Sequence, residues 1–194
     1  MQEIMVAPYS DAYRQGVLDV ILPIQQREFG IPITAADQPD LTSIAEFYQS
    51  GTGGFWVARS NGNVVGTIGL KDIGAKQTAL RKMFVAAPFR GRELGVAGKL
   101  LDTLLAHARA KGVAEIFLGT TDKFLAAHRF YEKRGFMELP KAELPKAFPV
   151  MAVDSKFYVL CVAEAYTTLH VASMNFIHVR LWLGRNTCRS RRHD

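Results

Sequence analysis

One segment in the middle of the chain restricts the fold more than any other. The β-prone Met83-Phe84-Val85 leads into a basic turn, Arg90-Gly91-Arg92, and this turn leads into a helix predicted over Gly95–Ala110. The helix is predicted because apolar residues recur every three to four positions, at Val96, Leu100, Leu104 and Ala108. Free backbone N–H groups at such a helix start, with glycines that allow close approach, favour an anion site. An ordinary strand–helix turn with two surface arginines is the alternative on these residues alone.

The hydrophobic period places the other elements. A first strand is expected at Gln2–Val6, followed by a helix from Asp11 that Pro23 should kink, and by a helix capped by Thr34. Asn61-Gly62-Asn63 predicts a tight hairpin. The remaining expected elements are strands at Phe55–Arg59, Val64–Lys71, Leu80–Val85, Val113–Leu118, Phe136–Leu139 and Phe157–Val162, and a helix at Asp122–Lys133. This order predicts an α/β fold, a mixed α+β layer sandwich, and not an alternating doubly wound fold.

Composition excludes several classes of protein. A chain of 194 residues with 48% hydrophobic residues fits one globular domain. No window of 18 apolar residues predicts a membrane span, and the N-terminus does not resemble a secretory signal, so a cytoplasmic location is expected. Cys161, Cys188 and the scattered histidines lack the spacing of metal ligands, so no metal is expected. Of the net charge of +6, residues 163–194 carry half, which is too little to predict nucleic-acid binding.

Two sequence motifs resemble those of one family. The Walker and Rossmann glycine patterns are both absent from the basic turn. Arg92-x-x-Gly95-x-Ala97, however, is similar to the acyl-CoA signature of the GNAT superfamily of N-acyltransferases. The stretch from Ala127 to Phe136, with Phe130-Tyr131 at its centre, resembles the second motif of that family. The resemblance covers residues 1–162 and implies a central, mostly antiparallel sheet of six to seven strands flanked by about four helices.

The resemblance also implies a cofactor and its binding residues. Acetyl-CoA would serve as acyl donor, with its pantetheine arm along the strand and its pyrophosphate in the turn. The positions implied are Met83, Phe84, Val85, Arg90, Gly91, Arg92, Glu93, Leu94, Gly95, Val96 and Ala97. The N–H of Val85 would polarise the thioester carbonyl. Tyr131 would act as the general acid that protonates the departing thiolate, although it could instead be a core aromatic residue.

The general base is not assigned by the motifs. Asp72, at the end of a neighbouring strand, is one candidate, Glu28 is another, and a chain of water molecules is a third. Phe124 stands where the family often has a cofactor-contacting asparagine, so that contact is lost or replaced.

The expected function is acetyl transfer from acetyl-CoA to a primary amine by direct attack. A non-catalytic acyl-CoA sensor and a nucleic-acid module built on the basic tail are the alternatives. Four acidic residues in a stretch without lysine or arginine suggest a small-molecule or peptide acceptor that is cationic: Glu28, Asp37, Asp40 and Glu46. Arg81 and Lys82 are placed with the cofactor-side cations. Residues 163–194 form an extension outside the family pattern, expected to be disordered or a dimerisation segment, and a homodimer is one possibility.

Overall fold

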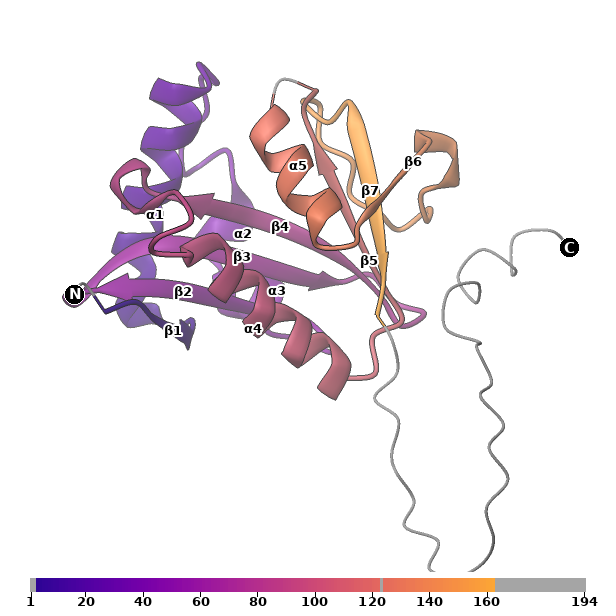
Figure 1. Cartoon of the computed structure of the whole chain (residues 1–194), viewed down its shortest axis with the longest axis horizontal. Helices are drawn as coiled ribbons and strands as arrows, with labels where there is room; N and C mark the ends of the chain where they lie inside the picture. Colours follow the sequence, from indigo (N-terminus) through magenta and orange to yellow (C-terminus); the bar gives the residue numbers. More distant parts are fainter. Residues whose placement is uncertain (1–2, 123, 163–194) are drawn as a thin grey trace, which may run out of the picture.

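The computed structural model describes residues 3–122 and 124–162 (Figure 1). The expected C-terminal extension, residues 163–194, lies outside the described residues, so the predicted division of the chain at residue 162 stays a prediction.

A seven-stranded sheet in the order β1-β2-β3-β4-β5-β7-β6 forms the centre of the molecule. Its pairs are antiparallel except β4 with β5, which confirms the predicted mixed α/β fold. The strands are β1 (Met5–Pro8), β2 (Gly54–Ser60), β3 (Asn63–Asp72), β4 (Gln77–Val85), β5 (Glu115–Thr120), β6 (Met137–Leu139) and β7 (Lys156–Cys161). The predicted hairpin joins β2 to β3, because Asn61 and Gly62 both adopt the positive φ angles that the turn needs.

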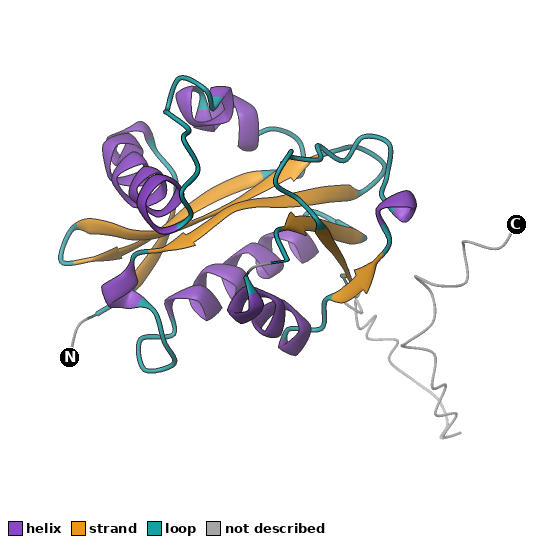
Figure 2. Ribbon diagram, turned by 90° about the horizontal axis from the view of Figure 1, so that it is seen from above, coloured by secondary structure: helices purple, strands orange, loops and turns teal. Residues whose placement is uncertain are grey.

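Helices cover both faces of the sheet (Figure 2). One face packs against α4 (Val96–Ala110) and α5 (Leu125–Lys133), and the other packs against α1 (Arg14–Pro23) and α3 (Ile44–Tyr48). The short α2 (Pro39–Thr42) precedes α3, so the single helix expected from Thr34 is in fact two. Thr34 caps neither of them, since it bonds to Asp37 and Pro39 begins the first helix.

Proline ends the first long helix where the sequence predicted a kink. α1 stops at Pro23, and a π-helical turn, η2 (Ile24–Glu28), continues in the same direction. Pro23 has no N–H to donate, so the regular hydrogen-bond ladder cannot continue through it. The turn places Glu28 and Phe29 beside β4. Glu28 pairs there with Arg90, and Phe29 lies near Phe84.

The strands β4 and β5 separate partway along the sheet, and this separation creates the site. They pair in parallel from Gln77 opposite Glu115 to Ala79 opposite Phe117, and no further pairs follow. Figure 1 shows β5 and β7 turning away from the direction of β4. The backbone of β4 beyond Ala79 is therefore left without a neighbouring strand on that side.

A β-bulge changes which side chains of β4 face each way. Thr67 pairs with Phe84 and Gly69 with Arg81, so Lys82 and Met83 together stand opposite Ile68. Lys82 takes a positive φ of 52°, which a lysine rarely adopts, and its carbonyl accepts a hydrogen bond of 2.7 Å from Thr67 Oγ1. Lys82 points to the α2 side of the sheet and Met83 to the α5 side.

Two features are absent from the described residues. No helix between residues 3 and 162 has the length and apolar character needed to cross a bilayer. No group of three or more histidine, cysteine, aspartate or glutamate side chains that could hold a metal was found there either. The cytoplasmic location expected from the sequence stays a prediction.

Candidate active site

A cavity of about 680 Å³ lies at the separation of β4 and β5, on the face covered by α4 and α5. Its size is typical of a small-molecule site. The residues that line it are Met83, Val85, Arg90, Gly91, Arg92, Gly95, Ala97, Gly98, Ala126, Ala127, Phe130, Tyr131 and Arg134. Seven of the positions predicted to bind the cofactor line this cavity, namely Met83, Val85, Arg90, Gly91, Arg92, Gly95 and Ala97.

The start of α4 forms the polar end of the cavity. Gly95 caps the helix with a φ of 60°, a conformation that glycine adopts without strain. Lys99 N donates to Gly95 O, so the N–H groups of the preceding turn have no acceptor within the helix. Together with the guanidinium groups of Arg90 and Arg92, these donors make the cavity suited to a phosphate or pyrophosphate.

The sequence analysis did not predict all the residues of the cavity wall. Arg134 is the most polar of those that it missed. Its guanidinium donates 3.0 Å to Gly98 O and pairs with Asp102 at 3.0 Å, crossing the first turn of α4. A side chain on Gly98 would come 3.1 Å from that guanidinium, so the glycine makes room for it. A glycine inside an otherwise strong helix was the available signal, because such a position usually reflects a close approach. Phe130 packs against the core and also lines the cavity.

Val85 offers its backbone to the open side of β4. Its carbonyl accepts a 2.7 Å hydrogen bond from Arg90 Nε, and this arginine lies away from β3. In an extended strand the N–H and C=O of one residue point the same way, so the Val85 N–H also faces the opening. Arg90 is itself held by Glu28 through two bonds of 2.8 and 2.9 Å. A ligand pairing with this strand would have to displace the Arg90 side chain from the Val85 carbonyl.

Tyr131 stands in the cavity wall next to Met83. Its ring is buried, with 8% of the residue exposed, and its hydroxyl donates to Met83 Sδ at 3.3 Å. Burial raises the pKa of Tyr131 above its usual value, so the hydroxyl stays protonated at neutral pH. A thioether sulfur is a weak acceptor, which leaves the proton available to a stronger base.

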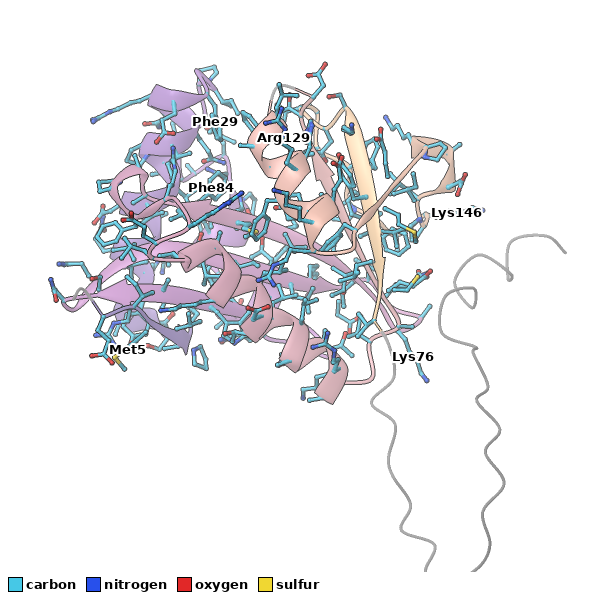
Figure 3. The ribbon with its side chains drawn as sticks, viewed as in Figure 1. Met5, Phe29, Lys76, Phe84, Arg129 and Lys146 are labelled. Carbon is cyan, nitrogen blue, oxygen red and sulfur yellow. The ribbon has the colours of Figure 1, made fainter. Side chains whose placement is uncertain are left out.

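Four predicted cofactor residues lie outside the cavity lining. Leu94 and Val96 pack in the core between α4 and the sheet, and Glu93 does not line the cavity. Phe84 lies on the opposite face of β4, where its ring centroid is 6.5 Å from that of Phe29 (Figure 3). Successive side chains of a strand point to opposite faces, so Phe84 faces away from the cavity that its neighbours Met83 and Val85 line.

Asp72 is not brought to the cavity. It is the last residue of β3, where it pairs with Thr78 near the start of β4. The cavity lies near the other end of β4. Its carboxylate accepts hydrogen bonds from the backbone N–H groups of Thr52, at 2.9 Å, and Gly74, at 2.7 Å. These bonds hold the pKa of Asp72 below its usual value. Its position and its bonds give it a structural role, and we do not retain it as the candidate base.

We expect Asp72→Asn to lower stability without lowering turnover, because its amide oxygen can replace only part of two charge-assisted hydrogen bonds. The loss should be about 1 kcal/mol at neutral pH. Since the folded-state pKa is lowered, the stabilisation is present above the unfolded-state pKa and disappears as the pH falls through the folded-state value. Thermal unfolding at pH 7 and pH 3 checks this: the difference between variant and parent should shrink at pH 3. A large fall in kcat would return Asp72 to the site.

The acidic residues on the other face are mostly paired. Asp40 forms a buried ion pair of 3.3 Å with Lys82, their side chains being 8% and 6% exposed. Tyr48 donates to the same carboxylate at 2.6 Å. Glu28 is paired with Arg90, which also removes it as a free base. The sequence interpretation was therefore wrong in placing Lys82 on the cofactor side.

Phe124 packs against Phe29 with the ring planes tilted by 35° and the ring centroids 4.1 Å apart. This contact joins the turn after η2 to the segment before α5 across the separation of the strands. Phe124 does not line the cavity.

A fold of this kind, with an anion cradle at the separation of two parallel strands, is found among acyltransferases, and comparison with known proteins gives the same class. The acetyltransferase (GNAT) family pattern matches residues 18–136. The chain is 37% identical over 109 residues to a probable N-acetyltransferase family 8 member 5 of Mus musculus, covering 54% of this chain and 47% of that protein. It is 35% identical over 106 residues to an N-acetylaspartate synthetase of Danio rerio, covering 54% and 37% respectively.

Solved structures agree. A GNAT-family acetyltransferase of Staphylococcus aureus Mu50 aligns with a TM-score of 0.79 and 39% identity, covering 83% of this chain and 100% of that one. An N-acetylglutamate synthase of Neisseria gonorrhoeae, complexed with coenzyme A and N-acetyl-glutamate, shares the fold at 19% identity and a TM-score of 0.64, covering 84% and 36%. The chain belongs to the acetyltransferase (GNAT) family, as its two motifs predicted. It spans about half or less of the curated relatives named above.

Proposed function

We propose that this protein transfers an acetyl group from acetyl-CoA to a primary amine by direct attack, with Tyr131 as the general acid. The observation that carries the proposal is the cavity itself: it joins the start of α4, the open backbone of Val85 and the Tyr131 hydroxyl in one space. The coenzyme A complex of a structural neighbour supports an acyl-CoA ligand for this cavity.

Each part of the cavity has a task in this reaction. The N–H groups of the first turn of α4 and the two arginines of the preceding turn bind the pyrophosphate. The Val85 backbone pairs with the pantetheine arm, and its N–H stabilises the negative charge that develops on the thioester oxygen. Tyr131, kept protonated by burial, gives its proton to the sulfur as the carbon–sulfur bond breaks.

A non-catalytic acyl-CoA sensor would need the same cradle but no proton donor. The Tyr131 hydroxyl favours the enzyme, because it is buried in the wall of the cavity and its one recorded hydrogen bond goes to a weak acceptor. Replacing that hydroxyl separates the two functions, since only the enzyme needs it.

The acceptor is a small molecule or a peptide with a free amine. The suggestion of a cationic acceptor rested on four acidic residues, and two of these are neutralised by ion pairs, Glu28 and Asp40. A third, Asp37, accepts two hydrogen bonds from Thr34 and keeps its negative charge. Because two of the four charges are paired, we do not carry that acceptor class forward.

Release of free thiol from acetyl-CoA, measured across a panel of amines, tests the proposed function. We expect amine-dependent thiol release together with acetylated product detected by mass spectrometry. Calorimetry that shows acetyl-CoA binding without turnover for any amine would favour the sensor. If acetyl-CoA does not bind, both the enzyme and the sensor are contradicted.

A further inference from the structure

Two opposite charges border the separation of β4 and β5 on the face that does not hold the cofactor cavity. They are Arg81 on β4 and Asp154 in the loop before β7. The last parallel pair is Ala79 with Phe117, so continuing the same register by two residues would put Arg81 beside Gly119. Arg81 and Gly119 therefore stand on the two sides of the opening, where the strands have ceased to pair.

Asp154 lies directly over Gly119. A Cβ atom on residue 119 would collide with the Asp154 carboxylate. Asp154 can therefore pack against β5 because Gly119 has no side chain. Oδ2 accepts a hydrogen bond of 2.9 Å from Met151 N. In the described part of the chain Oδ1 has no donor. The partly buried carboxylate thus keeps one oxygen for a further donor.

Arg81 is similarly short of partners. Its guanidinium donates to Met151 Sδ at 3.1 Å, and none of the ion pairs of the described residues includes it. Lys82, the next residue, is neutralised by Asp40. Arg81 is therefore a cation beside the opening that a ligand can use, and a guanidinium binds a carboxylate through two parallel hydrogen bonds.

The opposite face holds the proton donor for the thiolate. Met83 is two residues from Arg81 along β4, about 7 Å. Its sulfur contacts Tyr131 on the α5 side. A nucleophile entering from the Asp154 side would therefore approach the opening from one face, while the leaving sulfur meets Tyr131 on the other. The bulge in β4 makes this division. Arg81 and Met83 are two residues apart and would share one face of a regular strand, whereas the extra residue places them on opposite faces.

From this arrangement, and resting on the proposed function, we infer that the acceptor is an amine that also carries a carboxylate, of the amino-acid type. Arg81 binds its carboxylate, and Asp154 binds its ammonium group and accepts the first proton from it. The freed amine nitrogen bonds to the thioester carbon, and the carbon–sulfur bond breaks as Tyr131 protonates the sulfur. The second proton leaves the nitrogen and restores Tyr131 through solvent, and Asp154 returns its proton to solvent.

The charges around Asp154 are consistent with a base of this kind. Burial raises the pKa of Asp154, while Arg81 from β4 and Lys141 from η4 (Lys141–Glu143) lower it. A carboxylate with a raised pKa is a better proton acceptor than one that is fully solvated.

The first experiment compares matched acceptors at saturating acetyl-CoA. The pairs are alanine with ethylamine, and phenylalanine with 2-phenylethylamine, which differ only in the carboxylate. We expect kcat/KM at least 10-fold higher for the carboxylated member. Arg81→Met should raise KM for that member by roughly 10- to 100-fold, the range of a charge-assisted hydrogen bond, and leave the decarboxylated amine unchanged. Arg81→Lys should restore part of the loss, and Arg109→Met, which removes an exposed cation of α4, should change neither.

The second experiment tests Asp154 by its pH profile. Asp154→Asn keeps an oxygen for Met151 N, so thermal unfolding should stay close to that of the parent. We expect kcat/KM to fall about 100-fold at pH 7 for both members of a pair, and to recover toward pH 10, as a growing fraction of the amine is deprotonated in solution.

Several outcomes would overturn the inference. Equal rates for both members of every pair, or an unchanged KM in Arg81→Met, would show that the acceptor needs no carboxylate. A pH profile of Asp154→Asn that matches the parent would show that Asp154 is not the base. If no pair reacts while acetyl-CoA still binds, the acceptor assignment fails but the cofactor site stands. Reaction with other amines alone would leave the proposed function intact.

Discussion

Gly95→Asp is expected to weaken acetyl-CoA binding about 100-fold or more while leaving the protein folded. The new carboxylate would lie at the start of α4, where the free N–H groups and Arg92 otherwise attract the pyrophosphate. Folding should survive at some cost in stability. The nearest atom to a Cβ at this position is Arg92 O at 3.8 Å, an ordinary contact, while the positive φ of 60° strains any side chain there. Aspartate and asparagine are among the residues that adopt such a φ most often.

Gly95→Asn is the matched control for that variant. It has the same shape as aspartate without the charge, and asparagine tolerates the positive φ of 60°. Calorimetry with acetyl-CoA should show a much smaller loss for asparagine than for aspartate. If both variants bind equally well, the phosphate does not lie at the start of α4, and the cofactor assignment fails.

Removing the hydroxyl of Tyr131 should have the second large effect. We expect Tyr131→Phe to lower kcat by roughly 100-fold, the usual contribution of a general acid. Binding of acetyl-CoA and stability should change little, because the hydroxyl donates only to the weak acceptor Met83 Sδ. Burial also raises the pKa of Tyr131, so the alkaline side of the pH–rate profile should show no loss from its ionisation below about pH 10.

Tyr158→Phe provides the comparison, since Tyr158 is fully buried and its ring centroid lies 6.4 Å from that of Tyr131. Its hydroxyl donates to Glu132 at 3.0 Å and does not line the cavity. This variant should lose some stability and keep its kcat. Wild-type turnover in Tyr131→Phe would make Tyr131 a structural residue and would favour the acyl-CoA sensor.

Local patterns predicted most of the framework correctly. The β-prone segments of β2 and β3 and the Asn61-Gly62 turn predicted the hairpin, and a single apolar stripe predicted α4. These features depend on residues that are close together in the chain, so they can be predicted from the local sequence. The boundaries moved by a few residues where tertiary contacts decided them. β4, for example, begins at Gln77 and not at Leu80, because its first residues pair with β5.

The sequence by itself determined the family and the strand–turn–helix unit, and it predicted the residues of the proposed phosphate cradle, because all three depend on short, contiguous motifs. Only the tertiary structure decided which residues face each other across the opening. The β4 bulge, the buried pair of Asp40 and Lys82, the crossing of Arg134 over Gly98 and the seat of Asp154 on Gly119 all join distant segments. Such contacts depend on how the sheet and its layers pack, and no local period of the sequence encodes them.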